Sequence, residues 1–378
     1  MKFSRFTTVK SIIAALAVSI LFTFNVLTVT LPKDDDPAVT FSKCWDYPAS
    51  PNLSAVSAGD GDTVYLVDTD RKLLAVDLSS GALLWSSDLA GDPVSNVLAT
   101  HGLVIVASQV SAGKAVLRAL SRPTGITQWS ADLPSATSVL LGTLNGTVVA
   151  LSSAGLASAF ESERGAPSWT KEIGAAVTTP PFFQGRTLIV GTDRKEVLAI
   201  SIPGGQTTVV TKLAGIPTAV FASDPDNVLL GDDRGNLVLT SLSGKRDWKF
   251  RNGARISAVG GYDAEYLVTS HDNFLYKLTE GGNVEWKRRL SARIDKHSTI
   301  FDRTLIVSTV GDGNVFVVDL ANGKIVNRIE TGEETSVQSV AGRTGFAVIS
   351  PKGLSFYSRN CPGSKKAAPD AVPPREKS

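Results

Sequence analysis

Short runs of alternating apolar and polar residues recur through the chain after residue 44, separated by turns rich in glycine, aspartate, asparagine and serine. From Ser54 to Trp85 the chain reads SAVSA, the turn GDGD, TVYLVDT, a polar turn at 70–72, LLAVDL, the turn SSG and ALLW. Alternation over such short runs, bounded by turn-forming residues, is typical of β-strands. The pattern predicts an all-β body of short strands joined by tight turns.

This unit of four runs returns about every 40 residues, which is the period of a four-stranded propeller blade. Its clearest mark is a glycine followed four residues later by tryptophan, and two units keep the glycine but lose the tryptophan. The marks are Gly81/Trp85, Gly125/Trp129, Gly165/Trp169, Gly205/Val209, Gly244/Trp248, Gly282/Trp286 and Gly323/Asn327.

The number of blades follows from how the repeat begins and ends. Seven marked units are complete, and the chain then adds only the three runs TSVQSVA, GFAVIS and GLSFYS. Trp45 lies one repeat before Trp85, so the start of the body can supply the missing outer strand. We therefore predict an eight-bladed β-propeller over residues 44–361, with four antiparallel strands per blade, closed by an N-terminal strand.

The two cysteines, Cys44 and Cys361, bracket this predicted ring. Cys44 adjoins the donated outer strand, and Cys361 follows the strand that would pair with it. Neighbouring strands lie about 5 Å apart, which is within reach of a disulfide. An even pair in an exported protein favours a Cys44–Cys361 disulfide, with two unrelated thiols as the alternative.

Residues 11–32 are uncharged and largely apolar, and Lys2, Arg5 and Lys10 precede them. The segment is long enough to span a membrane, and the preceding positive charges favour a cytoplasmic N-terminus. We predict a retained transmembrane signal anchor, with a long cleavable signal peptide as the alternative. Either way the propeller is exported.

The resulting domain scheme places a single-pass protein in the cytoplasmic membrane, with its propeller on the extracytoplasmic side. The flanking segments are short and polar, and the last of them is rich in proline and is expected to be disordered. The scheme assigns 1–10 to the cytoplasmic segment, 11–32 to the anchor, 33–43 to a stalk, 44–361 to the propeller and 362–378 to the tail.

The repeat RKLLAVDLSSGALLW, residues 71–85, resembles the quinoprotein-type (PQQ-like) propeller repeat, and GNVFVVDLANGKIVN, residues 313–327, matches its first half. Within that superfamily, size and exported location are most similar to the BamB-like propeller scaffold of the outer-membrane β-barrel assembly machinery. The resemblance implies a noncatalytic scaffold that binds envelope or membrane proteins. Cys44 is preceded by FSK rather than a lipobox, which indicates a signal-anchored version.

The same resemblance implies that the tryptophans pack between neighbouring blades and do not form a sugar-stacking set. Their constant position after the turn glycine supports this interpretation, because an indole there would bury a large apolar area. The residues expected in this role are Trp45, Trp85, Trp129, Trp169, Trp248 and Trp286.

Candidate chemistry is sparse. The three histidines, His101, His271 and His297, lie in separate units without metal-ligand spacing. Acidic turns such as 231–236 lack EF-hand spacing, and tight turns favour Asp-Gly and Asn-Gly for backbone reasons alone. We expect no catalytic, cofactor-binding or metal site, and a degenerate quinoprotein remains an alternative.

The net charge is only +2, which argues against nucleic acid as a partner and makes any charge effect local. The connectors after Trp248 and Trp286 nevertheless concentrate cations. A local field of this kind can attract an acidic protein or an anionic envelope polymer, whereas the alternative is a solvated rim with local salt bridges. The candidate partner-binding residues, on a propeller expected to be monomeric, are Lys249, Arg251, Arg255, Lys287, Arg288, Arg289, Arg293 and Lys296.

Overall fold

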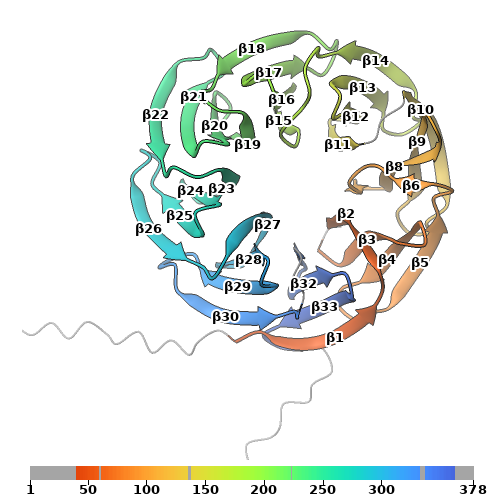
Figure 1. The fold of residues 1–378 in the computed structure, drawn as a ribbon. Coiled ribbons are helices and arrows are strands. Elements are labelled where there is room, and N and C mark those ends of the chain that lie inside the picture. Colours follow the sequence, from red (N-terminus) through yellow and green to blue (C-terminus); the bar gives the residue numbers. More distant parts are fainter. Residues whose placement is uncertain (1–39, 59–60, 135–137, 223, 333–336, 362–378) are drawn as a thin grey trace, which may run out of the picture. The chain divides into compact units, whose positions relative to one another are not determined.

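The computed structural model describes residues 40–58, 61–134, 138–222, 224–332 and 337–361. Within these ranges the chain forms eight separate antiparallel sheets. Figure 1 shows the sheets arranged as a ring through which the chain passes in order. The predicted eight-bladed β-propeller is therefore confirmed.

In blades 1 to 7 the chain begins at the innermost strand and ends at the outermost one (Figure 1). In blade 2 the short β6 and β7 both pair with β8 and share the innermost position. Blades 1 to 4 contain β2 (Pro51–Ala58), β3 (Thr63–Asp68), β4 (Lys72–Asp77) and β5 (Leu83–Asp88); β6 (Asp92–Pro93), β7 (Leu98–Ala99), β8 (Leu103–Ser111), β9 (Lys114–Ser121) and β10 (Thr127–Pro134); β11 (Val139–Leu144), β12 (Thr147–Ser152), β13 (Leu156–Glu161) and β14 (Pro167–Glu172); and β15 (Phe182–Gln184), β16 (Thr187–Gly191), β17 (Glu196–Ser201) and β18 (Thr207–Lys212).

Blades 5 to 7 repeat this order, and blade 8 takes its outermost strand from the beginning of the described chain. Their strands are β19 (Pro217–Ala222), β20 (Asn227–Asp232), β21 (Asn236–Ser241) and β22 (Arg246–Arg251); β23 (Ile256–Tyr262), β24 (Glu265–Ser270), β25 (Phe274–Leu278) and β26 (Val284–Arg289); β27 (Arg293–Phe301), β28 (Thr304–Val310), β29 (Asn314–Asp319) and β30 (Ile325–Glu330); and β31 (Gln338–Ala341), β32 (Gly345–Ser350), β33 (Gly353–Ser358) and β1 (Ser42–Pro48).

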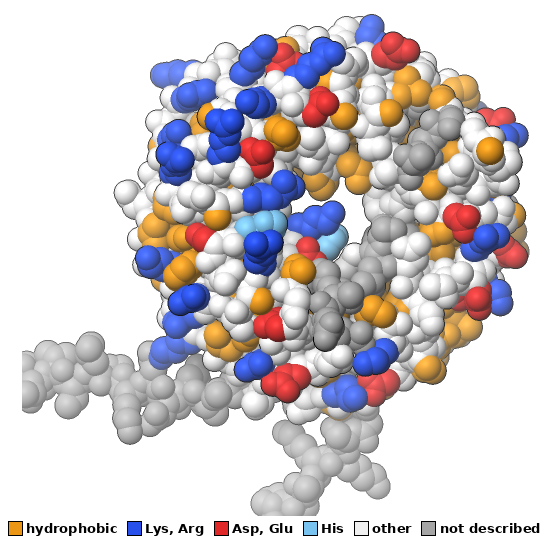
Figure 2. All heavy atoms as spheres, viewed as in Figure 1, with side chains coloured by type: hydrophobic (Ala, Val, Ile, Leu, Met, Phe, Trp, Pro, Cys, Tyr) orange, Lys and Arg blue, Asp and Glu red, His pale blue; other side chains and the backbone are white. Residues whose placement is uncertain are grey.

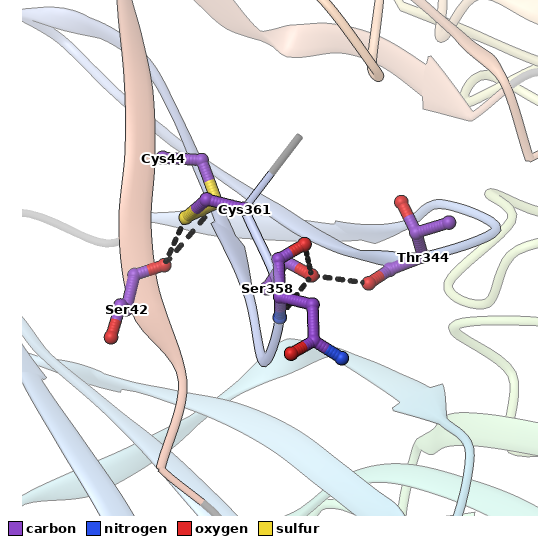
Figure 3. Close-up of a disulfide and its surroundings, with 6 residues drawn as sticks. Ser42, Cys44, Thr344, Ser358 and Cys361 are labelled. Carbon is purple, nitrogen blue, oxygen red and sulfur yellow. Dashed lines mark hydrogen bonds between the residues drawn. A yellow bond between two sulfur atoms is a disulfide. The ribbon is translucent and has the colours of Figure 1, made fainter. Parts of the chain in front are cut away.

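The ring closes where β1 pairs with β33, with Trp45 opposite Phe356. The predicted disulfide is present, because Cys44 and Cys361 are bonded with their Cα atoms 5.1 Å apart. Figure 3 shows this bond beside the backbone oxygen of Ser42, which lies 3.6 and 3.8 Å from the two sulfurs. The donated strand and the disulfide together join the two ends of the ring.

The closing strand begins slightly before the predicted boundary at residue 44. Ser42 is its first residue, and the preceding Phe41 is buried in an edge-to-face contact with Phe346, at 5.1 Å between ring centroids. The predicted segments 1–10 and 11–32, most of the stalk and the tail at 362–378 lie outside the described residues. Within the described ranges, no helix has the length and apolar character of a membrane span.

The core lies between adjacent blades. Middle strands such as β12 and β20 bury nearly every residue, because neighbouring blades cover both of their sides. Outer strands such as β22 and β26 are exposed or half-buried throughout, and the two classes alternate from the second residue onward. One cluster, for example, packs Leu151 of blade 3 against Leu188 and Val190 of blade 4. This arrangement explains why the middle strands are continuously apolar in sequence, whereas the outer ones alternate.

Strand direction divides the ring into two faces. Because consecutive strands are antiparallel, the connections between blades lie on the same face as the turns between the second and third strands of each blade. We call this the connector face. The other turns lie on the opposite face, where the described chain begins at Thr40 and ends at Cys361. We call this the termini face.

Candidate protein-binding site

The tryptophans form contacts between blades. Trp85 of blade 1 lies against Gly125 of blade 2, and its Nε1 donates a hydrogen bond to the backbone oxygen of Arg122 at 2.8 Å. A Cβ at Gly125 would approach the indole to 2.4 Å, and the φ of this residue is +69°, a conformation that favours glycine. Trp129, Trp169, Trp248 and Trp286 donate in the same way to the next blade.

The sixth tryptophan differs in one respect. Trp45 packs against Gly81 of blade 1 and stacks on Phe356, at 5.4 Å between ring centroids. Its buried Nε1 has no hydrogen-bond partner within the described part of the chain. The six indoles therefore lie at blade interfaces and are unsuited to ligand stacking.

The predicted basic residues come from three blades. Lys249 and Arg251 lie on β22 of blade 5, and Arg255 follows in the connector. Blade 6 contributes residues 287–289 at the end of β26, and blade 7 contributes Arg293 and Lys296 from β27. All except Arg288 are exposed. The structure thus gathers seven of the eight cations around the connector-face ends of three consecutive blades.

Arg288 is half-buried and does not belong to this exposed set. Its Nε donates a hydrogen bond to the backbone oxygen of Gly323 in blade 7. On β26 it alternates with Lys287 and Arg289, so it points to the same side of the strand as Trp286. The prediction that Arg288 faces a partner is therefore corrected: its guanidinium links two blades.

Two further cations belong to the same surface. Arg234 lies in the turn between β20 and β21, and Arg194 lies in the corresponding turn of blade 4. Both are exposed. The predicted set contained only cations of the connectors between blades, but the turns between second and third strands lie on the same face. We define the basic sector as Arg194, Arg234, Lys249, Arg251, Arg255, Lys287, Arg289, Arg293 and Lys296.

The basic sector differs from the rest of the ring in its lack of ion pairs among the described residues. At equivalent places on the connector face, two cations outside the basic sector are paired: Arg71 with Asp92 at 2.7 Å and Lys212 with Glu196 at 2.8 Å. No basic-sector cation makes an ion pair within 4.0 Å in the described ranges. Figure 2 shows blue side chains gathered where Figure 1 places β18, β22 and β26, whereas red and blue lie side by side near β5. A rim neutralised by local salt bridges therefore does not describe this surface.

A groove lies beside the basic sector between blades 5 and 6. Its volume is about 450 Å³, and its lining includes Phe250, Tyr276, Val284, Arg251 and Lys287. The rings of Phe250 and Tyr276 meet edge to face at 5.4 Å. Val284 is 44% exposed. The groove also contains one carboxylate, Glu285, which pairs with Lys277 at 3.0 Å. It thus combines accessible apolar area with two cations, which suits a protein segment better than a purely polar ligand.

His271 lies among the cations at the connector-face end of blade 6. Its backbone N–H donates to the backbone oxygen of Arg255 at 2.9 Å. Burial, and then the nearby Arg255 and Arg293, lower the pKa of His271 below its ordinary value, with Asp295 opposing them. Burial likewise lowers the pKa of His297. Bringing a negative charge to this surface would favour protonated His271.

The acidic turn at 231–236 is satisfied by the protein itself. Asp232 is fully buried and accepts hydrogen bonds from the backbone N–H groups of Gly215, Arg234 and Asn236. Within the described ranges, no group of three or more His, Cys, Asp or Glu side chains is placed to hold a metal ion. This carboxylate therefore organises a turn.

Comparisons with known proteins agree with this geometry. The family described as "Outer membrane protein assembly factor BamB" matches residues 40–143, 113–249 and 205–352. The architecture is thus that of a PQQ-like propeller, and the chain belongs to the BamB family. It is 23% identical over 332 residues to the outer membrane protein assembly factor BamB of Yersinia pestis, covering 80% of this chain and 81% of the relative.

Solved structures show the same fold at low identity. BamB from Moraxella catarrhalis has a TM-score of 0.66 at 13% identity, with 84% of this chain and all of that chain covered. The computationally designed Ika8 protein has a TM-score of 0.70 at 15% identity, with 84% and 98% covered. Sqt1 of Saccharomyces cerevisiae has a TM-score of 0.67 at 12% identity, with 83% and 97% covered.

Proposed function

We propose that this chain is a noncatalytic, membrane-anchored scaffold that binds other envelope proteins during the assembly of outer membrane proteins. Family membership supports the assembly role. Under this proposal residues 11–32 anchor the chain in the cytoplasmic membrane, with the propeller on the extracytoplasmic side. The basic sector and the adjoining groove hold an acidic segment of the partner that carries an apolar anchor.

The observation that carries this proposal is the set of unpaired cations on one face. An exposed arginine or lysine with no carboxylate within 4.0 Å remains available to attract an approaching partner, and arginine can bind a carboxylate through two hydrogen bonds. The groove adds apolar area next to that charge. Interfaces commonly combine a small apolar centre with a polar rim.

Affinity recovery of the full-length, tagged chain from crosslinked cells tests the proposal. Mass spectrometry should identify a specific set of envelope proteins, and the Arg251→Glu/Arg289→Glu variant should recover them at least tenfold less efficiently. The anchor segment alone is the control. Recovery of an anionic envelope polymer without protein would instead support the alternative function of a polymer-binding module. Equal recovery by wild type and variant would contradict the proposed site.

A further inference from the structure

A small cavity lies between the inner strands of blades 6 and 7, apart from the groove described above. Its volume is about 180 Å³, the space of about six water molecules. Thr269 of β24 and Lys296 and Ser298 of β27 supply its polar lining, and Val259, Leu267 and Leu305 contribute to its apolar wall.

The cavity exists because β27 departs from the regular blade pattern. In β19 and β23 a single extra residue interrupts the pairing with the next strand, at Thr218 and Ser257. In β27 the pairing passes from Ile294 opposite Thr309 directly to Ser298 opposite Val307. The three residues 295–297 of β27 therefore lie opposite a single residue of β28, Ser308. Bulges of this kind redirect side chains and are treated as built features of a strand.

The position of Thr269 shows what this irregularity changes. The fifth residue of the corresponding strand is Gly191 in blade 4 and Gly231 in blade 5. A Cβ at either glycine would come within 2.3 or 2.6 Å of the next blade, at Pro217 or Ile256. In blades 4 and 5 the next blade packs directly against this glycine. In blade 6 there is room for a threonine side chain and for a cavity beside it.

The polar groups of the cavity are unpaired within the described part of the chain. Thr269 is 3% exposed, and its Oγ1 has no hydrogen-bond partner among the described residues. A buried hydroxyl normally has one, so an unsatisfied one calls for an explanation. The ammonium of Lys296 forms no ion pair with any described residue, and no Asp or Glu is among the described residues that line the cavity.

We propose that this cavity binds a small aliphatic carboxylate. Lys296 supplies the counter-charge, the hydroxyls of Thr269 and Ser298 donate hydrogen bonds to the carboxylate oxygens, and the apolar wall holds a branched alkyl group. Either a free short-chain acid or the C-terminal residue of a peptide has this chemistry. A quinone cofactor is too large for the volume. The site shares Lys296 with the basic sector, whereas Thr269 and Ser298 lie outside it. Loss of binding in Thr269→Val with partner recovery unchanged would therefore separate the cavity from the proposed scaffold function.

Isothermal titration of the full-length chain with isobutyrate and with the peptide Gly-Gly-Val tests this site. At least one probe should bind, and its neutral amide should bind at least tenfold more weakly. Binding of isobutyrate alone would identify a free acid, and a preference for the peptide would identify a chain terminus. If neither carboxylate binds, or if the amides bind equally well, the proposal is overturned.

Variants give an independent check that does not depend on lost folding. A Cβ at Gly260, which also lines the cavity, would meet nothing within 4 Å. Gly260→Val should therefore fill the cavity, keep or raise the thermal midpoint and abolish binding. Thr269→Val and Lys296→Gln should each weaken binding tenfold or more. Unchanged affinity in all three variants would overturn the assignment.

Discussion

Asn327 of blade 7 donates a hydrogen bond from Nδ2 to the backbone oxygen of Phe41 at 3.3 Å, across the seam where the ring closes. Asn327 occupies the place that tryptophan takes in six other blades, and five of those indoles donate a hydrogen bond to the next blade. Each of the five donates to a backbone oxygen, as Trp85 does to that of Arg122. The seam thus reproduces the contact between ordinary blades with residues that are 286 positions apart.

Reduction of the Cys44–Cys361 disulfide should lower the free energy of unfolding by about 2–4 kcal/mol, because the bond restricts the unfolded chain. Urea unfolding with and without dithiothreitol measures the difference. The Cys44→Ser/Cys361→Ser variant should match the reduced protein and be insensitive to dithiothreitol. An oxidised protein no more stable than this variant would show that β-pairing alone closes the ring.

Trp85→Phe should destabilise the protein more than Trp45→Phe. The first substitution leaves the backbone oxygen of Arg122 without its donor, at a cost of about 1–3 kcal/mol, in addition to the lost apolar area. The second removes an N–H that has no partner in the described ranges. Urea midpoints of the two variants give the comparison, and equal losses would refute a role for the hydrogen bond.

Stability should fall as the pH is lowered through about 6.5. The pKa values of His271 and His297 are lowered in the folded protein, so the unfolded chain binds protons first and is favoured as the pH falls. His271→Gln and His297→Gln should each remove part of this decrease. Thermal midpoints between pH 7.5 and pH 5.5 measure it, and variants as pH-sensitive as the wild type would contradict the assignment.

Charge reversal should separate two neighbouring arginines on β26. Arg288→Glu should lower the thermal midpoint, because it breaks the hydrogen bond to Gly323 and places a carboxylate between two blades. Arg289→Glu should leave the midpoint nearly unchanged, since its side chain is exposed. It should instead reduce partner recovery and the dependence of that recovery on salt. The reverse pattern would show that the strand alternation has been misassigned.

The repeat made most of the fold predictable. The spacing from Trp45 to Trp85 and the three leftover runs after Asn327 were sufficient to predict the blade number, the donated strand and the cysteine pairing. These features depend on periodic patterns, which the sequence displays directly. The repeat did not predict the individual contacts of Trp45. Whether its Nε1 finds a partner among the described residues depends on the exact geometry of the seam.

The candidate sites were less accessible to sequence reasoning. Charge counting found the cations of blades 5 to 7 but could not tell that Arg288 turns toward blade 7, because that depends on the register of β26. It missed Arg234 because turns and connectors had not been assigned to faces. The cavity at Thr269 depends on a pairing irregularity in β27 that has no sequence signature.

The most direct test of the binding site is photo-crosslinking in cells from two matched positions. Val284 lines the groove between blades 5 and 6, and Leu83 occupies the corresponding position of blade 1; both are 44% exposed. With a photoreactive amino acid at each position in turn, Val284 should crosslink to a specific envelope protein and Leu83 should not. Equal crosslinking from both positions, or none from Val284, would contradict binding at the basic sector and its groove.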